Sequence, residues 1–275
     1  MGALVWLASY PKSGNTWMRA YLHNLFINPA EPLPPDTLVR FTASDTYKPW
    51  YRQANDGVMP EDFDEETLAR LRPVAQRLIT GSHPDSVFVK THAANLEQNG
   101  VPMINPEVTA GAIYIVRDPR DVAISVTHHY GVTLDQAIAR MANPKGGTAV
   151  SDTQIPQLIS SWSLNVSSWT AVPNPQLHVV RYEDMLDKAF VTFGGIAKFL
   201  GVDAGKERLQ KAIRFSSFNA LKALESKHGF AERSVNAQSF FREGRKEQWK
   251  KILTPEQART IEGQHAEQMR RFGYL

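Results

Sequence analysis

Residues 8–17, ASYPKSGNTW, combine residue types that can hold an anion. Lys12 carries a positive charge and Thr16 carries a hydroxyl. Ser13 and Gly14 are small, so the backbone can approach a ligand closely there. An apolar run precedes this turn and a helical pattern follows it, so backbone N–H groups should point at one spot near a helix N-terminus. This arrangement favours phosphate binding.

The order of these residues differs from that of the common ATP-binding loop. In GxxxxGK[ST] the lysine follows the glycines and is itself followed by Ser or Thr. Here Lys12 precedes Gly14, and Thr16 lies four residues beyond the lysine. A nucleoside triphosphatase is therefore disfavoured. An ordinary turn with a solvated lysine is the alternative for this turn taken alone.

A second candidate anion site lies in YIVRDPRDVAIS. Arg117 ends an apolar run, and its fork of donors can bind phosphate oxygens bidentately. Asp118 and Pro119 suit the N-cap and the first position of a helix, and Asp121, three residues after Asp118, resembles the acidic residue of a capping box. Ser125 follows four residues later on the same helix face. The alternative is a capped helix with Arg117 paired to a carboxylate.

A candidate base lies in VFVKTHAANL, where Lys90 and His92 end an apolar run. Histidine exchanges its proton near neutral pH, which suits a general base. The chain has eight histidines, so His92 is favoured by its place at the end of a strand pattern rather than by its type.

These segments together resemble the sulfotransferases that use 3′-phosphoadenosine 5′-phosphosulfate (PAPS). YPKSGNTW is similar to the family's YPKSGTTW, with Asn15 in place of the first threonine. The Arg117 segment is similar to RNPKDVAVS, and Lys90, Thr91 and His92 match the family's KTH element. The resemblance covers residues 4 to about 255 and is concentrated in four motifs. It implies PAPS as cofactor, adenosine 3′,5′-bisphosphate (PAP) as product, and no metal.

The resemblance also implies a role for each matching residue. Lys12 would contact the bridging oxygen and the 5′-phosphate, and Trp17 would stack on adenine, although a first-turn aromatic can equally belong to the core. Arg117 and Ser125 would bind the 3′-phosphate. The residues expected to cradle the 5′-phosphate are Ser13, Gly14, Asn15 and Thr16.

Three later segments resemble parts of the same binding site. RYEDM places Tyr182 beside the adenine, and SSF, similar to the family's TSF, adds Ser216 and Phe218. FFREGRKEQWK is similar to FMRKGxxGDWK, a loop that closes over the 3′-phosphate, and it supplies Arg242 and Gly244.

This last segment also departs from the family pattern. Glu243 stands where lysine is usual, and Glu247 and Gln248 stand where Gly and Asp are usual. Because a carboxylate repels a phosphate, Glu243 is expected to point away from it. Arg245 and Lys246 are candidates to replace the missing charge.

The implied reaction is transfer of a sulfuryl group by in-line displacement to a hydroxyl or amine of a small-molecule acceptor. In it, His92 deprotonates the acceptor, while Lys12 and Lys90 stabilise the departing bisphosphate. The residues expected to line an apolar acceptor pocket are Trp50, Tyr51 and His128. The sequence leaves the identity of the acceptor open.

The elements that must position these residues follow an α/β pattern. Apolar runs at 3–8, 87–90, 112–116 and 177–180 predict buried parallel strands. Apolar residues at helical spacing predict helices over 15–26, 65–79, 155–170, 190–200 and 255–272. Residues 28–50 and 226–246 show no regular pattern and are expected to be lids or binding loops. The predicted fold is one three-layer α/β domain, 1–275, with a central parallel sheet flanked by helices.

Composition narrows the setting of this domain. The chain has 275 residues, 42% of them hydrophobic, and a formal net charge of +3. This mild basic bias suits an anionic ligand and disfavours nucleic acid as a partner. Cysteine is absent, which excludes disulfides and a thiol nucleophile. No apolar run approaches the roughly 20 residues of a membrane helix, so a cytoplasmic protein without a membrane partner is expected. The oligomeric state stays open.

Two alternatives remain at this point. A nucleotide kinase of related fold would prefer ATP with magnesium, although the lysine spacing argues against it. A non-catalytic module that binds adenosine nucleotides would bind PAP without turnover, and the altered segment around Glu243 gives this alternative some support.

Overall fold

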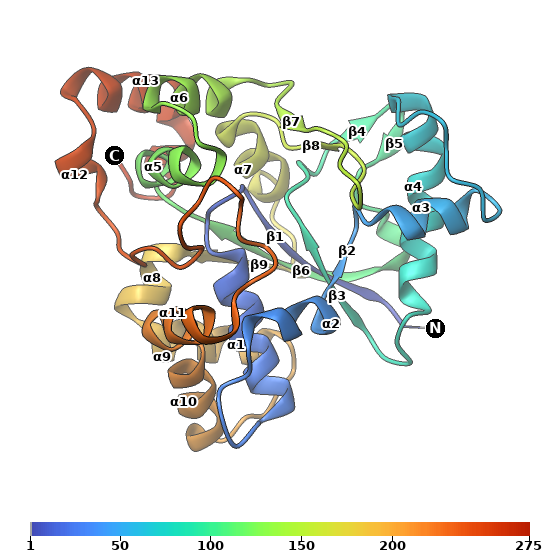
Figure 1. Cartoon of the computed structure of the whole chain (residues 1–275), viewed down its shortest axis with the longest axis horizontal. Coiled ribbons are helices and arrows are strands. Elements are labelled where there is room, and N and C mark those ends of the chain that lie inside the picture. The colour runs from blue at the N-terminus through green and yellow to red at the C-terminus, as the bar shows by residue number, and fades with distance from the viewer. Residues whose placement is uncertain (1) are drawn as a thin grey trace. The chain divides into compact units, whose positions relative to one another are not determined.

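The computed structural model describes residues 2–275 and has an α/β fold (Figure 1). Five strands form the main sheet in the order β2-β3-β1-β6-β9. β1 and β2 both pair with β3 in parallel, with Leu4 opposite Val87 and Ala43 opposite Val89. The strand bounds are β1 Leu4–Ser9, β2 Ala43–Ser44, β3 Val87–Thr91, β6 Thr109–Val116 and β9 Leu177–Arg181. The predicted α/β fold class, with a central parallel sheet and flanking helices, is confirmed.

The four predicted strands are present; β1, β3 and β6 are mostly buried, whereas in β9 only Val180 is buried. In β6 the last six residues are all buried, as expected of a strand covered on both faces. β2 was not predicted, since two residues carry no readable periodicity.

The chain folds as two compact units. Unit 1 comprises Met1–Tyr10, Thr42–Tyr114 and Asn143–Val179. Unit 2 comprises Pro11–Phe41, Ile115–Ala142 and Val180–Leu275. That these segments act as one domain stays a prediction.

Unit 1 contains helices α3 (Lys48–Ala54), α4 (Glu65–Thr80) and α7 (Trp162–Thr170). The helix predicted over 155–170 is wrong in its first half. Ser160 adopts a left-handed backbone with φ 69°, and the side chain of Ser161 caps α7 by accepting a hydrogen bond from the amide of Leu164. Two short ribbons complete the unit: β4 (Glu97–Gln98) with β5 (Val101–Pro102), and β7 (Gly147–Thr148) with β8 (Gln157–Leu158). A 3₁₀ turn also occurs at Pro106–Val108.

Unit 2 is mostly helical. Its α1 packs on α10, which in turn packs on α9 and α11 (Figure 1). An apolar cluster that includes Ala20, Leu221 and Phe241 joins α1, α11 and the loop after α11. The helices are α1 (Asn15–Ile27), α2 (Leu38–Phe41), α5 (Pro119–Tyr130), α6 (Leu134–Ala142), α8 (Tyr182–Asp187), α9 (Ala189–Phe199), α10 (Lys206–Phe215), α11 (Phe218–His228), α12 (Trp249–Ile252) and α13 (Pro255–Arg271), with a 3₁₀ turn at Pro35–Thr37.

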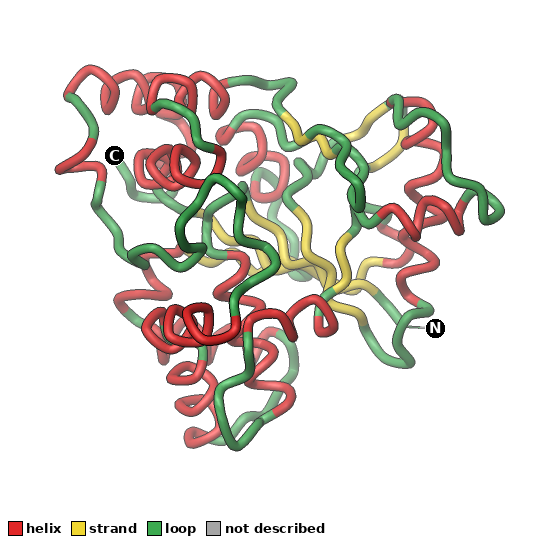
Figure 2. The backbone as a smooth tube through the Cα atoms, viewed as in Figure 1, coloured by secondary structure: helices red, strands yellow, loops and turns green. Residues whose placement is uncertain are grey.

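The two segments predicted as irregular differ from each other. Residues 28–50 contain several short elements, whereas residues 229–248 form a long loop after α11 (Figure 2). The carboxylates of Glu225 and Glu232 attach this loop to the helices of unit 2. Glu225 accepts hydrogen bonds from the backbone of Phe240 at 2.7 Å and Phe241 at 2.9 Å. Glu232 of the loop pairs with the buried Arg19 at 2.7 Å. None of the helices in the described chain combines the length and apolar character that crossing a membrane requires.

Helix α13 buries a histidine along with its apolar face. Ile261, His265 and Met269 recur at helical spacing and are all buried. Burial lowers the pKa of His265 to about 4, because the imidazolium form loses its hydration.

This burial predicts acid sensitivity. The unfolded chain takes up a proton at His265 as the pH falls below its ordinary pKa, while the folded chain does so only near its lowered pKa. Stability is therefore lost on acidification. Between about pH 7 and about pH 5, His265 should cost roughly 2 kcal/mol of unfolding free energy. His265→Leu should remove this component in urea unfolding, whereas the exposed His228→Gln should keep it. An unchanged pH slope in His265→Leu would contradict the assignment.

Candidate functional site

The turn between β1 and α1 has an unusual backbone. Lys12 has φ 67° and Gly14 has φ 106°, both in the left-handed region. A Cβ on Gly14 would lie 2.7 Å from Cδ2 of Tyr182, so only glycine fits there. The structure therefore brings Gly14 and Tyr182, which the sequence placed in one binding site, into contact.

This turn presents the start of α1 to a ligand. Met18 donates the first helical hydrogen bond to the carbonyl of Gly14, so α1 begins at Asn15. Throughout its described first turn, α1 has neither a side-chain cap nor an acidic residue, which leaves the positive end of its dipole uncompensated by side chains. Ser13 is 0% exposed, and its Oγ has no hydrogen-bond partner among residues 2–275. A buried hydroxyl without a partner is costly, which indicates a polar ligand beside Ser13.

Arg117 joins this turn to the loop of residues 229–248, called the late loop below. Its side chain is 6% exposed, and its terminal nitrogens donate to the carbonyl of Lys12 at 2.9 Å and to that of Arg245 at 3.1 Å. The guanidinium also lies 4.2 Å from the centre of the Tyr182 ring. Its Nε is buried without a partner in the part of the chain that the structure describes. Arg117, which belongs to the second predicted anion element, thus contacts the first.

Helix α5 holds the same loop through Asp121. The carboxylate of Asp121 accepts hydrogen bonds from the amides of Glu247 at 2.6 Å and Trp249 at 3.0 Å. Burial raises the pKa of Asp121, and the nearby positive charge of Arg117 opposes this shift. The late loop is therefore anchored to both Arg117 and Asp121.

The expected capping box at the start of α5 is wrong in one half. Asp118 does cap the helix, accepting from the amide of Arg120 at 2.9 Å. Its own amide, however, donates to Glu183 at 3.1 Å rather than to Asp121. This leaves Asp121 available for the late loop.

The late loop brings Gly244 and Phe218 together. Gly244 has φ 62°, and a Cβ there would collide with the Phe218 ring. Arg242 donates to Glu243 and to Gln248, both at 2.7 Å. The expectation that Glu243 points away is not supported, because its carboxylate pairs with the guanidinium expected to bind the phosphate. Nor is Lys246 a demonstrated replacement for the missing charge, since it pairs with Asp187.

The other predicted cofactor residues also lie in unit 2. Trp17 contacts Tyr182 and Phe193 edge to face, with ring centres 5.7 and 5.6 Å apart. The hydroxyl of Ser216 is buried and donates to the carbonyl of Ala212 at 2.8 Å. Ser125 is half-buried on α5, and Asn15 and Thr16 are buried at the start of α1. Their contacts with a nucleotide stay predictions.

Two histidines at the end of α5 have different surroundings. His129 places Nδ1 3.4 Å from Nζ of Lys12, and this ammonium also lies 4.4 Å from the centre of the Phe240 ring. His128 is exposed. Partial burial and the positive charge of Arg242 lower the pKa of His128. Acceptor binding by His128 stays a prediction.

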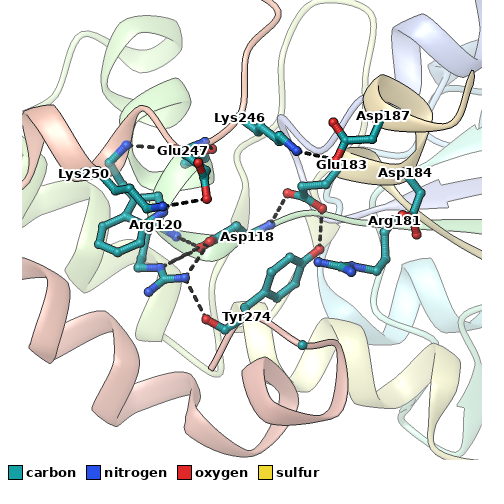
Figure 3. A pocket seen from close by; sticks show the side chains of 13 residues that line it. Asp118, Arg120, Arg181, Glu183, Asp184, Asp187, Lys246, Glu247, Lys250 and Tyr274 are labelled. Carbon is teal, nitrogen blue, oxygen red and sulfur yellow. Dashed lines mark hydrogen bonds and ion pairs between the residues drawn. The ribbon is translucent and has the colours of Figure 1, made fainter.

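A charged pocket of about 310 Å³ lies beside the late loop (Figure 3). Its charges largely compensate each other: Lys246 pairs with Asp187, and Lys250 pairs with Glu247. Arg120 forms ion pairs at 2.7 Å with Asp118 and with Glu262 and donates to the carbonyl of Tyr274. These contacts fix the late loop and the C-terminal residues, which gives the pocket a structural role.

Lys90 and His92 belong to unit 1, where hydrogen bonds hold both the ring and the backbone of His92. Its Nδ1 lies 2.8 Å from the carbonyl of Ser9. A carbonyl only accepts, so Nδ1 carries the proton and Nε2 is the basic nitrogen. The amide of His92 donates to Gln157 at 3.3 Å, and its carbonyl accepts from Asn165 at 3.0 Å. This fixes both the tautomer and the backbone of the predicted base.

A buried carboxylate supports this arrangement. Asp45 is 7% exposed and accepts from Thr91 at 2.9 Å and from Nε2 of Gln157 at 3.1 Å. Burial raises the pKa of Asp45 to about 6, although these hydrogen bonds oppose the shift. Sequence reasoning missed Asp45, Gln157 and Asn165. They lie in three separate segments and share no motif.

Trp50 and Tyr51, predicted to contact the acceptor, pack in unit 1. Tyr51 is 2% exposed and joins an apolar cluster with Leu68 and Leu71, and Trp50 packs against the same cluster. The structure gives both side chains a packing role, and acceptor contact stays a prediction. Across the described residues, no group of three or more His, Cys, Asp and Glu side chains could hold a metal ion.

Comparison with known proteins places the chain in a family. The model of the sulfotransferase domain matches residues 3–273. Cytosolic sulfotransferase 1 of Arabidopsis thaliana is 26% identical, over 93% of this chain and 75% of its own length. Sulfotransferase 2A2 of Mus musculus is 25% identical, over 97% of this chain and 84% of its own.

Solved structures show the same fold. Mouse sulfotransferase SULT7A1 complexed with PAP superposes with a TM-score of 0.64 at 20% identity, covering 98% of this chain and 84% of its own. Retinol dehydratase in a complex with retinol and PAP superposes with a TM-score of 0.66 at 20% identity, covering 97% and 81%. With the family model spanning nearly the whole sequence, the chain belongs to the sulfotransferase domain family and is a sulfotransferase.

Proposed function

We propose that the protein transfers a sulfuryl group from PAPS to a hydroxyl or amine of a small-molecule acceptor, and that residues 1–275 act as one sulfotransferase domain in the cytoplasm. Family membership supports sulfuryl transfer in general. Related structures contain PAP, and one also contains retinol. Relatives are named cytosolic sulfotransferases. The observation that carries the proposal is the position of Arg117, which belongs to the second predicted anion element and binds the backbone of both the first turn and the late loop.

Unit 2 fits a nucleotide with negative charge at two positions. The start of α1 and the buried Oγ of Ser13 suit the 5′-phosphosulfate. The buried Nε of Arg117 suits the 3′-phosphate. The hydrogen bonds that Arg117 donates go to backbone carbonyls, so an anion at its Nε would add a charge-assisted contact.

Unit 1 supplies the proton acceptor. Because Ser9 holds the Nδ1 proton, Nε2 of His92 is the atom that takes the proton from the acceptor hydroxyl or amine. When bound, PAPS would supply the sulfuryl group, and PAP would be the leaving group. Lys12 and Lys90 contribute positive charge that stabilises the negative charge developing on the 5′-phosphate of PAP.

The decisive experiment is a transfer assay with a panel of phenols, alcohols and amines and with PAPS as donor. Mass spectrometry should show an acceptor gaining one sulfuryl group. A parallel reaction with ATP and magnesium tests the kinase alternative. PAP binding without turnover on any acceptor would favour a non-catalytic nucleotide-binding module instead.

Replacing the base should separate chemistry from binding. His92→Ala should lower kcat by about 10²- to 10⁴-fold, because general-base catalysis is typically worth that much. PAP affinity measured by calorimetry should stay close to the wild-type value. Near-normal turnover in this variant would remove His92 from the mechanism.

Removing the positive charge of Lys12 should weaken nucleotide binding. Lys12→Met keeps most of the side-chain stem near Phe240 but removes the ammonium. PAP affinity should fall by about 10- to 100-fold, the range expected for hydrogen bonds to charged groups. The control is Lys206→Met, which removes one positive charge from the exposed start of α10. Equal losses in both variants would indicate a general charge effect and contradict a contact by Lys12.

A further inference from the structure

Arg242 lies where the late loop passes several other site residues. Its carbonyl accepts from Nζ of Lys222 on α11 at 3.4 Å. Two residues further on, Gly244 lies against Phe218. Just beyond this part of the loop, the amides of Glu247 and Trp249 bind Asp121 of α5, the helix that carries Ser125. The loop thus holds Arg242 among the residues expected to bind the 3′-phosphate.

The guanidinium of Arg242 already has two internal acceptors. One terminal nitrogen donates to a carboxylate oxygen of Glu243, and the other donates to the amide oxygen of Gln248, both at 2.7 Å. Gln248 is itself fixed, because its Nε2 donates to the carbonyl of Arg245 at 3.1 Å. Both acceptors stand at positions where the chain departs from the family motif.

These acceptors oppose phosphate binding in two ways. An incoming phosphate oxygen must share or displace them to reach the terminal nitrogens of Arg242. The carboxylate of Glu243 would also lie close to the negative phosphate, and like charges repel. Arg242 and Glu243 are 31% and 37% exposed, so solvent weakens their pairing but does not abolish it.

We propose that Glu243, aided by Gln248, masks Arg242 and so weakens the preference of this protein for adenosine nucleotides that carry a 3′-phosphate. Glu243 is then a residue that sets cofactor specificity. This inference rests on the proposed function, since it assumes that Arg242 faces the 3′-phosphate of PAPS.

The test compares two nucleotides that differ only in that phosphate. Dissociation constants for PAP and for adenosine 5′-phosphate are measured by calorimetry at one fixed ionic strength, because salt screens exposed charges. Glu243→Gln, which removes the charge but keeps the shape, should tighten PAP binding by about five- to tenfold. Binding of adenosine 5′-phosphate should change by less than about twofold, so that the ratio of the two constants rises.

Two further variants make the result specific. Glu247→Gln removes an equal charge from the same loop, but Glu247 pairs with Lys250 instead of Arg242, so PAP affinity should change by less than about twofold. In an Arg242→Ala background, Glu243→Gln should lose most of its effect, because the two residues act through one contact.

The outcomes distinguish the inference from the function on which it rests. An unchanged PAP constant in Glu243→Gln, or equal tightening of both nucleotides, overturns the masking by Glu243 while PAP binding by the wild type leaves the proposed function intact. An effect of Glu243→Gln that persists without Arg242 overturns it as well. Failure of the wild type and every variant to bind PAP overturns the proposed function, and the inference with it.

Discussion

A buried positive charge that donates its hydrogen bonds to backbone carbonyls is the constraint around which unit 2 is organised. Arg117 binds the carbonyls of Lys12 and Arg245, which lie near opposite ends of the chain. These hydrogen bonds engage its two terminal nitrogens but do not cancel its charge. The adjacent carboxylate of Asp121 is committed to the amides of the late loop. The fold therefore keeps a cation where an anionic ligand would complete the electrostatics, and the same contacts shape the backbone around it.

Unit 1 solves a different problem, which is to hold one imidazole in one protonation pattern. A carbonyl of β1 selects the tautomer of His92, while Gln157 and Asn165 fix its backbone. Asp45 fixes Gln157 in turn, at the cost of burying a carboxylate whose pKa rises. Such a network limits the directions in which the ring can turn, which is what a proton acceptor of defined geometry requires.

The sequence alone predicts those parts of the fold and site that are encoded in contiguous segments. The strands β1, β3, β6 and β9 and the helices α1, α4 and α13 follow from local apolar patterns, and Gly14 and Gly244 follow from contiguous motifs. The network of Asp45, Gln157 and Asn165 could not be predicted, because its members come from separate segments and meet only in the folded unit. The pairing of Arg242 with Glu243 was missed for another reason. Glu243 is repelled by a phosphate but attracted by the neighbouring guanidinium, and the sequence does not show which of these two effects decides its orientation.

Lys12 adopts a left-handed backbone conformation, which costs a residue with a Cβ about 1 to 2 kcal/mol relative to an unstrained one. Glycine would relieve this strain but would remove the ammonium group. Selection for heat resistance and selection for catalysis therefore favour opposite residues at this one position. In a directed-evolution experiment screened only for thermal tolerance, a glycine at this position would raise the stability of the fold and abolish the enzymatic activity in the same variant.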